Sequence, residues 1–208
     1  MGRPRLTFRR LSGLDRSGGP PPETLPGAPL RPFTIPNAIG YVRVACLVAF
    51  LLVALADDDG EGWTQFALFA VVAWGDYADG MAARITGQYS RLGALMDPVI
   101  DRALVICGVL VAYDHELLPR WALLVLIARE AVMLAVGPFY VRRRGELKIT
   151  MLGRWAVWPT MSAIAFALVG ADPIDEILLY VGVAMTLGAT AQYVGQALSP
   201  QDPGQAST

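Results

Sequence analysis

Residues 74–104 read WGDYADGMAARITGQYSRLGALMDPVIDRAL, and this stretch places four aspartates and three arginines between two apolar segments. If its first half is helical, five residues follow i, i+3, i+4, i+7, i+8 spacing and share one face: Asp76, Asp79, Gly80, Ala83 and Arg84. Asp97 and Asp101 are four residues apart and share a face of the next helix. The segment ITGQYSRLG between them is a short turn. The spacing therefore predicts that four carboxylates from two antiparallel helices meet near one end of the pair.

The composition around this stretch predicts a membrane protein. Hydrophobic residues make up 54% of the 208-residue chain, and its mean hydropathy is +0.45, which is too apolar for an ordinary soluble domain of this size. Runs of about 20 apolar residues, long enough to span a bilayer, recur at 38–56, 64–84, 92–113, 119–141, 155–170 and 176–198. We therefore expect an all-α integral membrane bundle of six transmembrane helices. A soluble helical bundle with the same helices would have too little polar surface.

The segments outside these runs predict the domain organisation and the orientation. Residues 1–33 are rich in Pro, Gly and Arg and are expected to be a disordered cytoplasmic segment without a cleaved signal peptide. Residues 34–198 would form the membrane domain, and residues 199–208 a polar tail. Arginine and lysine gather before the first helix and in alternate connections, whereas the other connections hold only Arg120. By the positive-inside rule, both termini and the carboxylates face the cytoplasm.

The chemistry of four intramembrane carboxylates calls for a cation. A bare aspartate costs about 2.5 to 3.5 kcal/mol at a helix centre on insertion scales, and four together repel one another. Oxygen ligands without His or Cys favour Mg²⁺ or Mn²⁺, and two such ions can hold a phosphoryl group. Arg84 is placed to contact a phosphate. The alternative is that Arg84, Arg91 and Arg102 simply neutralise the aspartates, but this would not explain the small residues at positions 80, 83 and 93.

The same residues carry a resemblance to a known family. The pattern Asp76-x-x-Asp79-Gly80-x-x-Ala83-Arg84, eight residues, Gly93-x-x-x-Asp97-x-x-x-Asp101 resembles the full signature of the CDP-alcohol phosphotransferase family. It fixes eight residues at defined spacing. The six-helix layout and the stretch TIPNAIGYVR at the start of the first helix are similar to the family as well. The resemblance covers residues 33–198.

The resemblance implies an integral membrane enzyme that transfers a phosphatidyl group from CDP-diacylglycerol to an alcohol and releases CMP. It implies that one or two Mg²⁺ or Mn²⁺ ions, most simply two, are held by Asp76, Asp79, Asp97 and Asp101. Asp101 would also accept the proton of the attacking hydroxyl as the catalytic base. The CDP-lipid would be bound by Pro36, Asn37, Gly80, Arg84 and Ser90. The resemblance also allows a homodimer, and we expect membrane lipids but no nucleic acid among the partners.

The acceptor alcohol is predicted less directly. The stretch SRLGALMDPVIDR is similar to the phosphatidylglycerophosphate synthase and actinobacterial cardiolipin synthase branch, which favours glycerol 3-phosphate. Its phosphate would need cations, and five on the same side could bind it: Arg142, Arg143, Arg144, Lys148 and Arg154. Many glycerophosphate enzymes carry a Gly-Lys-x-Lys-Thr stretch where this chain reads GELKITMLGR. Phosphatidylglycerol, which would give cardiolipin, and an inositol phosphate therefore stay open.

Two functions of other classes fit the sequence less well. Intramembrane carboxylates also mark ion transporters, but the helices continue beyond Asp76 as FALFAVVAW and beyond Asp101 as ALVICGVLVAY, without further polar residues for a path. The Pro-rich N-terminal segment could serve a membrane adaptor, but it lacks a clear PxxP docking context. An enzyme with a site open to the cytoplasm is the preferred interpretation.

Overall fold

The fold was analysed in a computed structural model that describes residues 21–144 and 151–198, without the side chains of residues 134–154, 193 and 196–198. These residues form a short 3₁₀ helix, η1 (Pro22–Thr24), and six long α-helices, with no strand among them. The long helices are α2 (Ile35–Ala56), α3 (Trp63–Thr86), α4 (Arg91–Asp114), α5 (Arg120–Arg144), α6 (Met151–Ala167) and α7 (Ile174–Leu198). The predicted all-α fold with six helices is confirmed, and the helices occupy the predicted apolar runs.

Local sequence signals set the ends of α2, α3 and α4. Helix α2 begins after Thr34, whose side chain accepts a hydrogen bond from the backbone N–H of Asn37 at 3.3 Å. Helix α3 ends at Gly87, which has the left-handed φ of 66° that glycine adopts without strain. Ser90 caps α4, because its hydroxyl accepts a hydrogen bond from the N–H of Gly93 at 2.9 Å. The turn between α3 and α4 is therefore only a few residues long.

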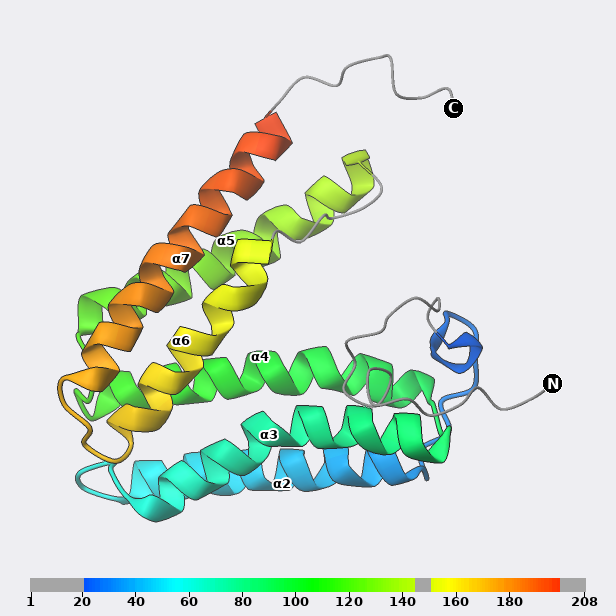
Figure 1. The fold of residues 1–208 in the computed structure, drawn as a ribbon, viewed down its shortest axis with the longest axis horizontal. Coiled ribbons are helices and arrows are strands. Elements are labelled where there is room, and N and C mark those ends of the chain that lie inside the picture. The colour runs from blue at the N-terminus through cyan, green and yellow to red at the C-terminus, as the bar shows by residue number, and fades with distance from the viewer. Residues whose placement is uncertain (1–20, 145–150, 199–208) are drawn as a thin grey trace. The chain divides into compact units, whose positions relative to one another are not determined.

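The chain divides into two compact units, and the first one ends at Val111. It contains η1, α2, α3 and nearly all of α4. Figure 1 shows α2, α3 and α4 running alternately in opposite directions beside one another. Phe50 of α2 and Phe69 of α3 meet edge to face with their ring centroids 5.5 Å apart, and both are fully buried. This apolar contact joins α2 to α3, the helix that carries the first half of the polar motif.

The second unit begins at Ala112 and contains α5, α6 and α7. Helices α6 and α7 approach closely at Gly182, where an added Cβ would lie 2.5 Å from the hydroxyl oxygen of Thr160. Trp121 of α5 stacks on Tyr180 of α7 with ring centroids 5.7 Å apart. Gly182 thus allows the close approach of α6 and α7, and the pair of Trp121 and Tyr180 joins α5 to α7.

Large apolar side chains are exposed along the helices of both units. Val42, Val48 and Leu52 are exposed on α2, and Ile177 and Leu187 are exposed on α7. Two helices of the described chain, Ile35–Ala56 and Ile174–Gln192, are long and apolar enough to cross a bilayer, and Trp155–Ala167 is a shorter apolar helix. So much exposed apolar surface is typical of a protein that lies in lipid. It suggests a membrane protein, as the sequence predicted.

Candidate active site

The four aspartates of the motif surround one side chain to which the sequence analysis gave no role, the guanidinium of Arg43 on α2. Its Nη1 donates to Oδ2 of Asp79 at 2.8 Å, and its Nη2 donates to Oδ1 of Asp101 at 2.7 Å. Nη1 also lies 3.7 Å from Oδ1 of Asp76 and 4.0 Å from Oδ1 of Asp97. The predicted convergence of the four carboxylates is therefore what the structure shows.

Burial differs sharply within this cluster. The side chain of Arg43 is 1% exposed and that of Asp79 is 6% exposed, whereas Asp76, Asp97 and Asp101 are 52%, 40% and 53% exposed. A buried arginine needs charged partners and hydrogen bonds to offset its lost hydration. Asp79 supplies both from the inside, and the other three carboxylates are partly exposed, so a ligand can reach them.

Gly75 makes the room in which Arg43 lies. A Cβ at position 75 would stand 2.6 Å from both Cγ and Cδ of Arg43, a distance that real side chains do not reach. The N–H at Nε of Arg43 donates to the carbonyl of Val72 at 3.0 Å, one turn earlier on the same helix α3. The arginine therefore lies flat against α3, and the glycine directly before Asp76 permits this approach.

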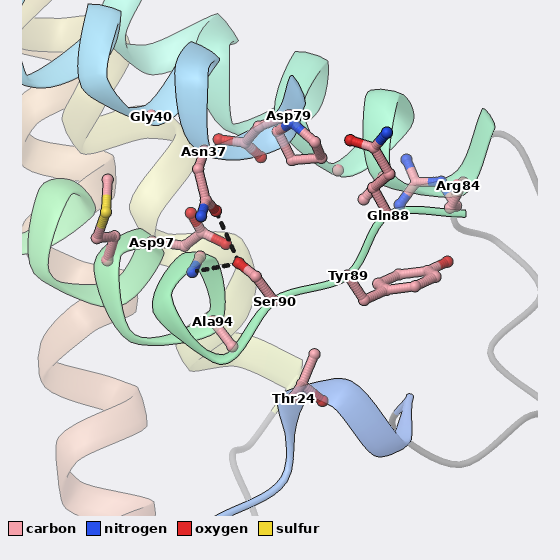
Figure 2. Close-up of a pocket in the computed structure, with 15 residues that line it drawn as sticks. Thr24, Asn37, Gly40, Asp79, Arg84, Gln88, Tyr89, Ser90, Ala94 and Asp97 are labelled. Carbon is pink, nitrogen blue, oxygen red and sulfur yellow. Dashed lines mark hydrogen bonds between the residues drawn. The ribbon is translucent and has the colours of Figure 1, made fainter. Parts of the chain in front are cut away.

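A pocket of about 180 Å³ opens beside the carboxylates, entirely within the first unit (Figure 2). Its wall includes all five residues predicted to bind the CDP-lipid, namely Pro36, Asn37, Gly80, Arg84 and Ser90. Asp79 and Asp97 line it as well, together with Ala83 and Gly93 of the motif. The structure thus brings the predicted nucleotide-binding residues and two of the predicted metal ligands into one cavity.

Asn37 and Ser90 shape this pocket through a chain of hydrogen bonds. The hydroxyl of Ser90 donates to Oδ1 of Asn37 at 2.8 Å, and the amide of Asn37 donates to the carbonyls of Arg31 at 2.9 Å and Pro32 at 3.2 Å. Figure 2 shows the first of these bonds and the one from Gly93 as dashed lines. Asn37 is fully buried and uses its oxygen and its nitrogen in these contacts. Its role is to fasten the start of α2 to the α4 cap.

Two glycines keep the pocket open. A Cβ at Gly80 would lie 3.3 Å from Nη1 of Arg84, so the guanidinium folds back over the glycine on the same face of α3. A Cβ at Gly93 would lie 2.8 Å from Oδ1 of Asn37 and would disturb the hydrogen-bond chain. A larger residue at position 93 would therefore displace Asn37, and one at position 80 would press on the guanidinium of Arg84.

The carboxylates fit a hard divalent cation by their chemistry. No three His, Cys, Asp or Glu side chains among residues 21–144 and 151–198 are arranged as a ready metal site. Arg43 stands among the four carboxylates, within 4.0 Å of each. All the available ligand atoms are carboxylate oxygens, and three of the four side chains are exposed on the open side. Such a donor set suits Mg²⁺ or Mn²⁺ and disfavours zinc.

The residues predicted to bind the acceptor phosphate give no test of that prediction. Arg142, Arg143 and Arg144 end α5 and Arg154 lies in α6, but their side chains are outside the described part of the structure. Lys148 lies outside the described residues altogether. All five belong to the second unit.

Sequence reasoning missed two residues that build the site, and it gave no role to a third, Arg43, which it noted only as part of the family-like stretch TIPNAIGYVR. Arg43 and Gly75 form the centre of the carboxylate cluster, and Thr24 of η1 lines the pocket. The signal for Arg43 was present: it is the sole charged residue of the apolar helix Ile35–Ala56. An ionisable residue within such a helix indicates a partner inside the protein. Thr24 had no such signal, because it lies in a Pro-rich segment that the sequence predicted to be disordered.

Known proteins match most of the chain, including the residues of this site. The family model described as CDP-alcohol phosphatidyltransferase matches residues 33–188, which confirms the resemblance seen in the motif. A protein named cardiolipin synthase (CMP-forming) from Streptomyces coelicolor is 35% identical over 171 residues, covering 78% of this chain and 79% of that protein. A protein named putative cardiolipin synthase from Mycobacterium tuberculosis is 32% identical over 167 residues, covering 79% of each.

A relative with a different name is also similar. A protein from Shigella flexneri named CDP-diacylglycerol–glycerol-3-phosphate 3-phosphatidyltransferase is 28% identical over 174 residues, covering 79% of this chain and 95% of that protein. Both kinds of relative are similar to the part of the chain that carries the carboxylates and most of the pocket.

Proposed function

We propose, because the chain belongs to the CDP-alcohol phosphatidyltransferase family, that it transfers a phosphatidyl group from CDP-diacylglycerol to the hydroxyl of a glycerol-containing phosphate and releases CMP. The observation that carries the proposal is the pocket that joins Arg84 and the predicted nucleotide-binding residues to Asp79 and Asp97. The chemistry of the site matches the reaction, since the cavity holds the guanidinium of Arg84, which can bind a phosphate, next to carboxylates that can bind a divalent cation.

In the proposed reaction the acceptor hydroxyl attacks the phosphorus that carries the diacylglycerol. A bond forms between the acceptor oxygen and that phosphorus, the bond from the phosphorus to the CMP oxygen breaks, and CMP leaves. Asp101 accepts the proton of the hydroxyl. Its side chain is half exposed, so an acceptor hydroxyl can reach the carboxylate. We assign the base to Asp101 for this reason.

Binding of the nucleotide is assigned to the pocket. Arg84 presents a planar guanidinium above Gly80, and such a fork can hold a phosphate through two parallel hydrogen bonds. Pro36, Asn37 and Ser90 form the wall toward α2. Asn37 and Ser90 act there mainly by holding the backbone in place, because their polar atoms are hydrogen-bonded to each other and to the chain.

Asp76, Asp79, Asp97 and Asp101 would hold the divalent cation, Mg²⁺ or Mn²⁺ and most simply two ions. When bound, the cation stabilises the negative charge that develops on the phosphoryl group and on the departing CMP. Asp79 is the buried carboxylate of the set, and the other three are partly exposed.

Two acceptors share the chemistry of a glycerol hydroxyl near a phosphate. Glycerol 3-phosphate is the acceptor favoured by the motif, and it occurs in the name of a relative that is 28% identical. Phosphatidylglycerol, which would give cardiolipin, is the second candidate. It is favoured by the names of relatives that are 35% and 32% identical and by the sequence GELKITMLGR in place of the Gly-Lys-x-Lys-Thr stretch.

The experiment that tests the function uses purified protein in detergent micelles or proteoliposomes. CDP-diacylglycerol and Mg²⁺ are supplied with glycerol 3-phosphate, phosphatidylglycerol or an inositol phosphate in turn, and CMP and the lipid product are identified. We expect CMP release with one of the first two acceptors and none after the metal is removed by a chelator. Full activity in excess chelator would refute the metal requirement, and cation flux without CDP-lipid would favour a transporter.

The proposed setting is a cell membrane that the six helices cross, with both termini and the site facing the cytoplasm. It rests on the exposed apolar surface and on the distribution of basic residues. Cysteine labelling tests it in a chain whose Cys46 and Cys107 are replaced by serine. A cysteine at Asp58 should react with an impermeant reagent in intact cells, and one at Thr86 should react only after permeabilisation. The reverse pattern would invert the proposed orientation.

A further inference from the structure

Arg43 is the part of the site to which the proposed reaction assigns no task. We propose that Arg43 is the positioning residue of the carboxylate cluster. By binding Asp79 and Asp101 at the same time, it holds their other oxygens where a divalent cation can use them. This inference rests on the proposed metal-dependent function and adds a specific residue, on a helix outside the motif, to the machinery that binds the cation.

The guanidinium of Arg43, on α2, is a rigid group that contacts both α3 and α4. From α2 its Nη1 reaches Asp79 on α3 at 2.8 Å, and its Nη2 reaches Asp101 on α4 at 2.7 Å. Its Nε donates to the carbonyl of Val72 on α3 at 3.0 Å, which fixes the plane of the guanidinium. All three distances are those of good hydrogen bonds. Because the guanidinium is planar and its donors have fixed directions, the three contacts together determine where the two carboxylates lie.

Arg43 hydrogen-bonds to only two of the four carboxylates, so oxygen atoms remain available as ligands for a cation. It takes one oxygen of Asp79 and one of Asp101, and a carboxylate has two oxygens that both accept hydrogen bonds or metals. Asp76 and Asp97 lie 3.7 Å and 4.0 Å from Nη1, beyond hydrogen-bond range, so only the charge of Arg43 acts on them. When ionised, four carboxylates and one guanidinium leave the cluster strongly negative. This negative charge can attract a divalent cation, whereas an arginine that fully neutralised the site would leave no such charge.

Burial explains why this task falls to an arginine from α2. At 1% exposure its position does not depend on solvent, and Gly75 provides the gap in which its Cγ and Cδ lie. A lysine reaching into the same gap would bring a single ammonium centre. It could not place two parallel donors on Asp79 and Asp101 and a third on Val72. The site therefore needs the shape of the arginine in addition to its charge.

The test is the affinity of the purified protein for Mn²⁺ alone, measured by electron paramagnetic resonance of the free ion. Groups that orient metal ligands commonly contribute 10- to 100-fold to metal affinity, so Arg43→Met should weaken Mn²⁺ binding by about that factor. Arg43→Lys should not restore it. Gly75→Ala, which pushes on the arginine without removing it, should give a smaller loss. The matched control is Arg120→Met, which breaks an exposed ion pair with Glu116 in the second unit and should leave the affinity unchanged.

The outcomes separate this inference from the proposed function. If the unaltered protein binds no Mn²⁺, the metal-dependent function itself fails. If it binds Mn²⁺ and Arg43→Met and Arg43→Lys bind equally well or more tightly, Arg43 is a neutralising or competing charge and the inference is wrong. Helix content and a single size-exclusion peak are checked for every variant. If Arg43→Met does not yield folded protein, weakened binding by Arg43→Lys and Gly75→Ala supports the inference and unchanged binding overturns it.

Discussion

The two units of this chain are built from similar apolar helices, yet the contacts that join the helices differ. In the first unit a buried arginine reaches from α2 to carboxylates on α3 and α4, and a chain of hydrogen bonds fastens α2 to the start of α4. In the second unit α7 meets α6 through a glycine against Thr160 and meets α5 through stacked aromatic rings. Burying the charged contacts of the first unit costs free energy and requires a specific geometry. The contacts of the second unit depend on how closely the helix surfaces fit.

This difference indicates a division of tasks. Charged groups persist inside an apolar bundle only where they are paired, and in such places they generally mark function. Changes at the polar contacts of the first unit should therefore affect catalysis first. Changes at the close contacts of the second unit should affect stability first. The predictions below test this division, beginning with the largest expected effect.

The largest effects are expected from two aspartates of the first unit. Asp101→Asn keeps the size of the side chain but removes the proton acceptor, so turnover should fall by about 10² to 10⁴-fold while CDP-lipid binding is better preserved. Asp79→Asn removes the innermost of the proposed metal ligands and should weaken metal-dependent nucleotide binding along with the rate. The measurement is nucleotide affinity and turnover at saturating Mg²⁺, with Asp58→Asn in the exposed loop after α2 as the control.

One pattern would contradict this assignment. If Asp101→Asn loses nucleotide affinity as severely as Asp79→Asn, and higher pH or more Mg²⁺ restores its turnover, Asp101 is chiefly a metal ligand. The base would then have to be another group.

A smaller effect is expected for Arg84→Lys. The charge stays, but the planar fork that can hold a phosphate through two bonds is lost, at about 1.5 to 3 kcal/mol for a charged hydrogen bond, or roughly 10- to 100-fold in kcat/KM. Arg120→Lys in the second unit is the matched control, since that arginine pairs with Glu116 at an exposed position. Activity of Arg84→Lys within about twofold of the unaltered protein would mean that Arg84 serves packing or topology instead.

The residues that the sequence predicted and those that it missed differ in what fixes their positions. Asp76, Asp79, Asp97 and Asp101 were found because helical periodicity and a short turn are local properties of the chain. Arg43 meets Asp79 across 36 positions and Asp101 across 58, and such a meeting depends on how α2 packs against α3 and α4. Periodicity carries no information about that packing.

The same contrast holds for the helices themselves. The apolar runs predicted all six helices of the described chain, because hydrophobic length is read directly from the sequence. The contact of Gly182 with Thr160 was not predicted, since a glycine in a helix can serve a close approach or nothing at all. Thr24 on the pocket wall was hidden for a further reason: a Pro-rich segment shows no periodicity that would place it.

In the second unit, Gly182→Ala should reduce stability and leave the site intact. The new Cβ would stand 2.5 Å from the hydroxyl oxygen and 3.0 Å from the backbone nitrogen of Thr160, and backbone cannot move aside easily. Overpacking of this kind costs about 1 to 3 kcal/mol, so the apparent Tm in detergent should fall by several degrees. Mn²⁺ and CMP affinities measured well below that Tm should match those of the unaltered protein. A large loss of either affinity would show that the two units do not divide the tasks as proposed.

The smallest effect is expected for Gly195→Ala, thirteen positions further along the same helix α7. An added Cβ there meets no atom within 4 Å, so the alanine brings no clash. A glycine in a helix is less favourable than alanine by about 0.5 to 1 kcal/mol, because it has more backbone freedom to lose on folding. Gly195 is close to the C-terminal end of α7, so the gain should be at the low end of that range and the apparent Tm should stay constant or rise slightly. Thermal unfolding of Gly182→Ala and Gly195→Ala side by side makes this a matched pair, with one helix, one substitution and opposite expected signs. If both variants lose the same stability, α7 is sensitive to alanine in general, and the contact with Thr160 is not what holds α6 and α7 together.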